Sequence, residues 1–226
     1  MPRQFRHLER SDVTLARAAW DAQASDQLPG DTPQRQPHLE WSQYPGHGPG
    51  IDILGPLQGK KVIELGCGNG DNLAAIAHEG AHCTGIDCSR AQLQRATTRW
   101  PDSNIQWEHT DAIAYLKHTR QRYDLAVSIF GAVGLSPPEQ LLTLLKHRIK
   151  PAGRLVFSLP SPTWLADKSH HLEIRNQTYP IARWNYPKAT WVLLLDSLGW
   201  HTTSVRPVKF RRRQCCTIFT AIPKLK

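Results

Sequence analysis

The sequence predicts a single α/β domain built around a mostly parallel sheet. Short apolar runs alternate with helix-like segments, and a turn with glycine at every second position follows the first of those runs. Two further strand-like runs flank a charged turn near the C-terminus. Parallel neighbours need a crossover connection, so alternation of this kind is typical of a parallel sheet covered by helices. The length of 226 residues suits one core rather than two full domains.

The composition favours a cytoplasmic protein. No apolar run is long enough to cross a bilayer, and the N-terminal residues lack the apolar core of a signal peptide. The cysteines are odd in number and have no metal-ligand spacing, so we expect reduced thiols and no bound metal. The net charge is +9, and residues 209–213 are the densest basic cluster. A solvated turn explains that cluster more simply than polyanion binding, which stays the alternative.

The first fifty residues read as a segment that precedes the core. Residues 11–24 carry a cap-type residue and amphipathic spacing, which predicts a helix, and residues 28–37 have a loop composition. Residues 38–50 are rich in both aromatic residues and glycine, with Trp41 and Tyr44 among them. Two interpretations stay open for these rings: they form a lid over a pocket, or they pack between a helix and the sheet.

From residue 51 on, most of the expected strands alternate with helices, and the last two strands form a hairpin. Gly80 gives a helix-stop signal, Ser89 and Gln92 fit a capping box, and Pro101 stops the next helix. The expected strands are 61–65, 82–86, 105–109, 123–130, 155–159, 200–208 and 215–222. The expected helices are a short one in 51–57, then 71–79, one from just after 87 to 100, 138–149 and 189–198.

The turn after the first strand is built to approach a ligand closely. It contains Gly66, Gly68 and Gly70, which lets the backbone come near a bound molecule. Asp87 ends the next strand, where a carboxylate in an open α/β sheet can bind a ribose diol. A dinucleotide site would need G-x-G-x-x-G, whereas here the third glycine comes one residue early and Asp71 follows it.

These residues resemble the nucleoside site of class I S-adenosylmethionine-dependent methyltransferases. The resemblance runs from about Gly50 to the C-terminus and implies a Rossmann-like, mostly parallel seven-stranded sheet with a C-terminal antiparallel hairpin. It also implies that Asp87 binds the ribose and that Asp111 accepts from the adenine amino group, with a helix cap as the competing role of Asp111. Glu64 is expected below the turn. The implied cofactor-binding residues are Trp41, Tyr44, Glu64, Gly66, Cys67, Gly68, Asn69, Gly70, Asn72, Asp87, Cys88, Asp111, Ala112, Ser128 and Phe130.

The loop 131–138 is expected to face the transferred methyl group. The motifs that DNA-base methyltransferases carry here are replaced by Ser128-Ile-Phe-Gly131, so base methylation by those routes is disfavoured. The aromatic-rich residues 160–187 resemble a substrate-pocket insertion. Substrate contacts are expected from Trp20, Phe130, Trp164 and Trp184, and the candidates for a general base are His47, Tyr44, His170 and His171.

The resulting expectation is a two-part chain, with an N-terminal helical lid over residues 1–50 and a methyltransferase domain over 51–226. It would methylate a small aromatic or heteroaromatic metabolite with S-adenosylmethionine, in natural product biosynthesis, and release S-adenosylhomocysteine. Residues 40–50 and the loop 130–133 look like actinobacterial-type enzymes of that kind. We expect a monomer or homodimer, without a membrane or nucleic-acid partner. The alternative is an S-adenosylmethionine-binding protein that engages RNA or a protein through Arg211–Arg213.

Overall fold

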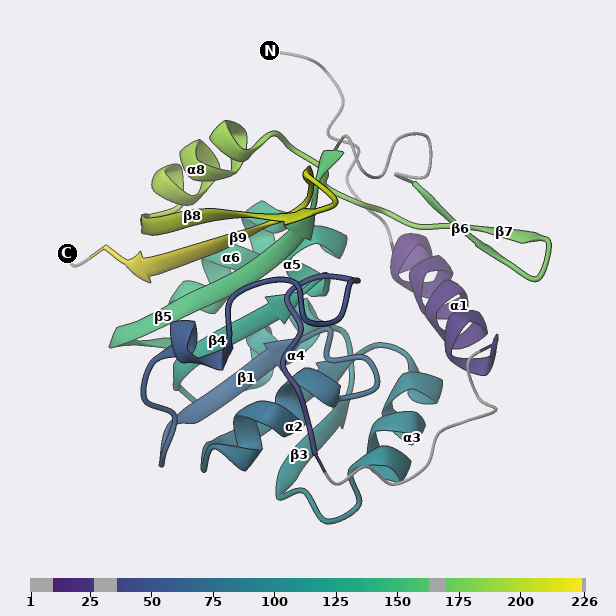
Figure 1. Ribbon diagram of the computed structural model, residues 1–226, viewed down its shortest axis with the longest axis horizontal. Helices are drawn as coiled ribbons and strands as arrows, with labels where there is room; N and C mark the ends of the chain where they lie inside the picture. The colour runs from purple at the N-terminus through teal and green to yellow at the C-terminus, as the bar shows by residue number, and fades with distance from the viewer. Residues whose placement is uncertain (1–9, 27–35, 163–169, 225–226) are drawn as a thin grey trace.

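The fold was analysed in a computed structural model, which describes residues 10–26, 36–162 and 170–224. A twisted sheet runs through the middle of the molecule with helices on both faces (Figure 1). The helices are α1 (Arg10–Asp26), η1 (Ile51–Leu54), α2 (Asp71–His78), α3 (Arg90–Arg99), α4 (Ala112–His118), α5 (Ala132–Leu135), α6 (Pro138–Lys146) and α8 (Lys188–Ser197). The strands are β1 (Lys61–Leu65), β2 (His82–Asp87), β3 (Ile105–His109), β4 (Tyr123–Ile129), β5 (Ile149–Pro160), β6 (His171–Ile174), β7 (Gln177–Pro180), β8 (Trp200–Phe210) and β9 (Arg213–Pro223).

The main sheet has seven strands in the order β3-β2-β1-β4-β5-β9-β8. The first five are parallel to one another, whereas β9 is antiparallel to both β5 and β8. The strand order reverses at β1, because β2 lies on one side of it and β4 on the other. Open α/β sheets bind ligands at such a switch point, beyond the carboxyl ends of the strands. The topology confirms the predicted fold class.

Each face of the sheet carries its own apolar layer. One layer joins α4, α6 and α8 to the sheet, and the largest of its fully buried side chains are Trp191, Trp200, Tyr123 and Phe157. The opposite layer joins η1, α2 and the end of α3 to the other sheet face. The central strands β1 and β4 are buried on both faces, which explains why they read as nearly continuous apolar runs rather than alternating ones.

Trp41 belongs to the second layer and not to an open lid. Its side chain is 1% exposed, and its carbonyl oxygen accepts a hydrogen bond from the Cys216 thiol at 3.4 Å. The backbone nearby is tied to α2, because the Glu40 N–H donates to the Asn72 side-chain oxygen at 2.8 Å. The Trp41 ring therefore packs in the core against the sheet and does not form a lid over a pocket.

A small sheet and a four-residue helix were not expected from the sequence, and α4 was foreseen only through the possible helix cap at Asp111. The two-stranded sheet β6–β7 forms inside the predicted insertion and lies beside α1 (Figure 1). Its turn uses Arg175 and Asn176 at positive φ, so the usual glycine signal for a tight hairpin is absent. The helix α5 has only four residues, too few to show a helical period in the sequence. Strand β5 is also longer than expected, since Lys150–Arg154 continue it instead of forming a separate turn.

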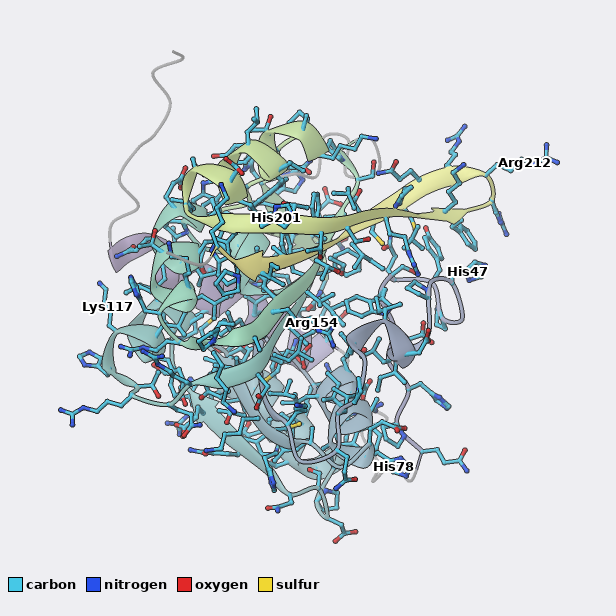
Figure 2. The ribbon with its side chains drawn as sticks, turned by 90° about the vertical axis from the view of Figure 1, so that its left-hand side faces the viewer. His47, His78, Lys117, Arg154, His201 and Arg212 are labelled. Carbon is cyan, nitrogen blue, oxygen red and sulfur yellow. The ribbon has the colours of Figure 1, made fainter. Side chains whose placement is uncertain are left out.

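The basic cluster forms the tip of the β8–β9 hairpin, as expected for a charged turn. Arg211 and Arg212 have φ values of 45° and 67°, and Arg212 extends from the end of the hairpin (Figure 2). Beneath the tip, the Phe210 ring stacks on Tyr44 with 3.7 Å between ring centroids, and His47 contacts Phe210 edge-on at 5.0 Å. In the described part of the chain, no helix has the length and apolar character needed to cross a membrane.

Candidate functional site

A cavity of about 450 Å³ opens beyond the carboxyl ends of β1, β2, β3 and β4. It therefore lies at the switch point of the sheet. Three kinds of residue surround it: the glycine turn with its neighbouring acids, the loop and helix after β4, and one face of α1. The predicted cofactor residues that line it are Glu64, Gly66, Cys67, Gly68, Asn69, Asn72, Asp87, Cys88, Asp111, Ala112 and Phe130, and Trp20 of the predicted substrate residues joins them.

The glycine turn is fixed to the end of β2 by backbone hydrogen bonds. The N–H groups of Gly66 and Cys67 both donate to the Ile86 carbonyl oxygen, at 2.8 and 3.0 Å. The turn then enters α2, whose N-cap residue Gly70 has a left-handed conformation with φ of 78°. The two hydrogen bonds therefore join the turn after β1 to the end of β2 at the floor of the cavity.

Two glycines of this turn are required for different reasons. A Cβ on Gly66 would lie 2.7 Å from the Ala132 nitrogen, so the backbone after β4 leaves no room for a side chain. A Cβ on Gly68 would meet no atom within 4 Å, because this residue faces open space at the cavity. Both have positive φ, 78° and 53°. Gly66 thus serves the close packing of the protein, whereas Gly68 leaves space for a ligand.

Asp87 is joined to the glycine turn from the other side. One carboxylate oxygen accepts from the Gly68 N–H at 2.8 Å and the other from the Ser89 N–H at 2.8 Å. Burial raises the pKa of this carboxyl group, while the two backbone N–H groups oppose the rise. The acid therefore lies at the cavity wall with its ionised form supported by backbone donors, which suits an acceptor for ligand hydroxyl groups.

Glu64 lies beneath the turn, as expected. It is 1% exposed, and one of its carboxylate oxygens is buried with no hydrogen-bond partner in the part of the chain that the structure describes. Burial raises the pKa of Glu64 well above its ordinary value, and the charges of Asp87 and Asp71 raise it further. A buried acid without a partner is costly, and a cationic group in the cavity would relieve that cost.

Asp111 takes the role of helix cap, and it also lines the cavity. Its Oδ1 accepts from the Ala114 N–H at 2.9 Å, which caps the first turn of α4. With Glu64 and Asp87 it gives one half of the cavity three acidic side chains from three successive strand ends. This half is therefore suited to a ligand with donor groups and positive charge.

Helix α1 forms the roof of the cavity. Ala16, Trp20 and Gln23 line the cavity from one face of this helix. The helix is fixed to the start of α3, because Asp21 Oδ1 accepts from the Ser89 hydroxyl at 2.5 Å and from the Ala91 N–H at 3.2 Å. Figure 1 shows α1 between α3 and the β6–β7 hairpin. An N-terminal segment therefore does cover the cavity, but it is α1 and not the aromatic segment 38–50.

The remaining half of the cavity is formed after β4 and after β7. Phe130, with φ of 50°, turns the chain at the end of β4, and the cavity wall continues along α5. Ser128 was expected to bind cofactor but lies below this wall: its hydroxyl donates to the Leu65 carbonyl oxygen at 2.9 Å and accepts from the Val133 N–H at 3.2 Å. Ser128 thus connects β1, β4 and α5 without facing the cavity.

Several residues named from the sequence lie outside the cavity lining. Tyr44 and His47 pack against Phe210 at the β8–β9 hairpin. His170 is exposed, and the His171 Nε2 atom lies 3.8 Å from a Glu173 carboxylate oxygen on the same strand. Others outside the lining are Trp41 in the core, Gly70 at the start of α2 and Trp184, which packs against the first apolar layer; Trp164 lies outside the described residues.

None of the four candidates for a general base lines the cavity. Burial raises the pKa of Cys67 well above its ordinary value, and that of Cys88 to about 12, so neither wall cysteine is a thiolate at neutral pH. Within the described ranges, no three histidine, cysteine, aspartate or glutamate side chains are grouped so that they could hold a metal ion.

Some residues that line the cavity were not predicted from the sequence. They come mainly from helices and from the chain after β7, so only the folded arrangement brings them to the cavity. The loop expected to face the methyl group supplies Gly131, Ala132, Leu135, Ser136 and Pro137. The missed residues are Ala16, Gln23, Ile86, Gln92, Arg95, Thr110, Ile113, Lys117, Ile129, Gln140, Ile181 and Ala182.

The comparisons with known proteins agree with this geometry. A family model described as "Methyltransferase domain" matches residues 62–153, which run from β1 into β5 and include the glycine turn, Asp87 and Asp111. Residues 62–153 are therefore similar to a methyltransferase domain. The match covers the acidic half of the cavity and the loop after β4, whereas the roof helix α1 and the β6–β7 hairpin lie outside it.

A curated relative of the methyltransferase domain is the "Ubiquinone biosynthesis O-methyltransferase" of Pseudomonas putida (strain GB-1). It is 31% identical over 110 residues, which are 48% of this chain and 47% of the relative. The chain thus spans about half the length of the curated relatives that it matches.

Solved structures extend the likeness in fold to most of the chain. The magnesium protoporphyrin IX methyltransferase from Synechocystis PCC 6803 with bound SAM has a TM-score of 0.64 at 16% identity, over 96% of this chain and 99% of that one. The 1,6-didemethyltoxoflavin-N1-methyltransferase of Burkholderia thailandensis has a TM-score of 0.58 at 16% identity, over 74% and 72%. Both support the class I methyltransferase fold, with a mostly parallel sheet of seven strands.

Proposed function

We propose that this protein transfers the methyl group of S-adenosylmethionine to a small-molecule acceptor, an aromatic or heteroaromatic metabolite. One observation carries the proposal: the cavity at the switch point of a methyltransferase domain has three acids in one half and an apolar wall around Phe130 in the other. The names of the relative and of the two solved structures, each a methyltransferase of a small molecule, support the acceptor class.

The acidic half fits the cofactor by charge and by shape. S-adenosylmethionine carries a sulfonium and an ammonium group, and the buried, unpartnered oxygen of Glu64 is the kind of acceptor that an ammonium group requires. Asp87 would accept from the ribose hydroxyls, and Asp111 from the adenine amino group. The open space at Gly68 leaves room for the ligand to lie directly on the backbone. When bound, the cofactor supplies an activated methyl group.

The protein would then have two tasks: it aligns the acceptor with the methyl group, and it excludes water from the reacting atoms. Displacement at a methyl carbon needs the nucleophile in line with the bond that breaks, so an acceptor held in the right pose gains most of the available acceleration. Trp20 in the roof and Phe130 in the wall would enclose an acceptor ring and keep water away. Because none of the predicted bases lines the cavity, we propose that the acceptor loses its proton to solvent before the ring is enclosed.

Calorimetry with S-adenosylhomocysteine, followed by turnover assays with a panel of phenols and nitrogen heterocycles, tests this function. We expect saturable binding of one molecule per chain and methylation of at least one acceptor class. If the product does not bind at millimolar concentration, the cofactor assignment is wrong. If it binds but the only methylated acceptor is RNA or a protein, the small-molecule assignment is wrong.

A further inference from the structure

A second, smaller pocket lies directly behind the wall of the main cavity. Phe130 and Leu135 line both spaces, so these two side chains separate them. The small pocket has a volume of about 10 Å³, which is room for a group the size of a water molecule. It is lined mainly by apolar groups, and the exception is Arg183 with its neighbour Asn185.

Arg183 is half-buried, and one atom of its guanidinium group is unsatisfied among the described residues. Its Nε atom is buried, and it makes no hydrogen bond within the described ranges. Burial lowers the pKa of the Arg183 guanidinium from its ordinary value, yet an arginine stays charged at any physiological pH. A buried charge without a partner is unfavourable, and an anion that made a charge-assisted hydrogen bond to it would relieve this cost.

The backbone that carries Arg183 is fixed on both sides. The Ile181 N–H donates to the His170 carbonyl oxygen at 2.9 Å, and the Trp184 N–H donates to the Gly134 carbonyl oxygen at 3.0 Å. Ile181 and Ala182 line the main cavity, whereas Arg183 and Trp184 line the small pocket. One short segment therefore contributes to both spaces and places the guanidinium next to the apolar half of the main cavity.

Glu64, Asp87 and Asp111 gather where the cofactor is proposed to bind, so an anionic group is disfavoured beside them. Arg95 and Lys117 also line the main cavity, so they compete with Arg183 for an anion. Because Phe130 and Leu135 separate the two spaces, a substituent of an acceptor enclosed by Trp20 and Phe130 would reach Arg183 once one of these two side chains moves aside. The small pocket can take the oxygen of an anionic substituent, but it is too small for a ring.

We propose that Arg183 is a specificity-determining residue that binds a carboxylate, or a similar acidic substituent, on the methyl acceptor. The inference rests on the proposed function and adds the acceptor class: a small aromatic acid. The pocket has room for one oxygen of the acid, and a charge-assisted hydrogen bond from the Arg183 Nε–H to that oxygen would contribute to orientation as well as affinity. The acid then sets which atom of the ring faces the methyl group.

Equilibrium binding of two matched probes tests this role without any need for turnover. The probes are 4-hydroxybenzoate and 4-hydroxybenzamide, which have nearly the same shape but differ in charge. Each is titrated into protein saturated with S-adenosylhomocysteine, in the wild type, Arg183→Met, Arg183→Lys and the control Arg212→Met. Arg212 is an exposed arginine at the hairpin tip and contributes to neither pocket.

In the wild type we expect the acid to bind at least tenfold more tightly than the amide, as charge-assisted hydrogen bonds predict. Arg183→Met should remove this preference, Arg183→Lys should retain part of it, and Arg212→Met should leave it unchanged. Equal affinities for the two probes in the wild type, or the same preference in Arg183→Met, would overturn the assignment, as would binding of neither probe. Titration of S-adenosylhomocysteine alone reports separately on the proposed function, because Arg183 does not line the main cavity.

Discussion

The carboxylate of Asp87 accepts a hydrogen bond from the backbone N–H of Gly68 at 2.8 Å, so the acid and the glycine turn act as one unit. A ligand that donates to the Asp87 carboxylate would also rest on the glycine turn, because Asp87 holds this turn in place. The predicted role of Asp87 therefore includes the shape of the cavity floor in addition to its charge.

Asp87→Asn should weaken the binding of S-adenosylhomocysteine at least tenfold, because charge-assisted hydrogen bonds contribute on the order of 1.5 to 3 kcal/mol. Isothermal titration calorimetry measures the change. Asp52→Asn, which alters an exposed acid on η1, is the matched control and should bind as the wild type does. An unchanged affinity in Asp87→Asn would remove the acid from the cofactor site.

The two glycines of the turn predict opposite phenotypes for the same substitution. Gly66→Ala places a Cβ against the Ala132 nitrogen, so it should lower the free energy of unfolding by several kcal/mol. Gly68→Ala meets open space and should cost about 1 kcal/mol for its positive φ, yet it should weaken ligand binding strongly. Urea denaturation and calorimetry on both variants separate these effects. Equal losses of stability would contradict the division.

The raised pKa of Glu64 predicts how stability depends on pH. Above its ordinary pKa of 4.5 the unfolded chain releases this proton while the folded protein retains it. The folded state then binds more protons, so the free energy of unfolding falls as pH rises from 4.5 toward the raised value. Glu64→Gln should make this part of the profile flatter, which denaturation midpoints between pH 4.5 and 8 would show. If the free energy of unfolding has the same dependence on pH in the wild type and in Glu64→Gln, folding does not raise the pKa of Glu64.

The histidines named from the sequence should be dispensable for methyl transfer. His47, His170 and His171 do not line the cavity, so replacing each with alanine should leave kcat within about twofold of the wild type, the range expected away from the site. Steady-state kinetics with the best acceptor provide the test. A general base usually contributes at least two orders of magnitude to the rate. A hundredfold fall in kcat for one of these variants would therefore show that the segment carrying that histidine moves into the site during turnover.

The link between α1 and α3 predicts that the roof can be loosened selectively. Asp21→Ala removes the acceptor of two hydrogen bonds and should cost about 1 to 2 kcal/mol, so amide exchange in residues 15–26 should accelerate. Ser25→Ala removes only a bond within the helix, to the Asp21 carbonyl oxygen, and serves as the control. Hydrogen exchange is measured by mass spectrometry. If Asp21→Ala and Ser25→Ala change the exchange rates in α1 equally, the hydrogen bonds from α3 to Asp21 contribute nothing to holding the helix.

The acidic half of the cavity could be read from the sequence because each part of it is local. Gly66, Gly68 and Asp87 follow directly on apolar runs, and parallel strands bring their carboxyl ends to one edge. The same holds for the strands and for most helices, whose ends carry glycine, proline or capping residues. Ser128 marks the limit of this reasoning: its position is local, but its hydroxyl points under the wall.

The other half depends on contacts between distant residues. Trp41 meets Cys216, which is 175 positions away, and nothing near Trp41 in the sequence distinguishes packing from a lid. The roof helix was visible as a helix, yet its place over the cavity depends on Asp21 and on the start of α3. Arg183 follows a hairpin without a glycine turn signal, so the segment that carries it had no readable structure.

The roof of the cavity joins an early part of the chain to a late one. Asp21 meets Ser89, and Asp26 forms an ion pair with Arg175 of the β6–β7 turn at 2.6 Å. During synthesis, the residues that cover the cavity emerge long before the hairpin that holds them. The contacts that hold α1 over the cavity are therefore complete only when Arg175 has been synthesised, and a fusion or truncation that alters α1 acts directly on the cover of the cavity.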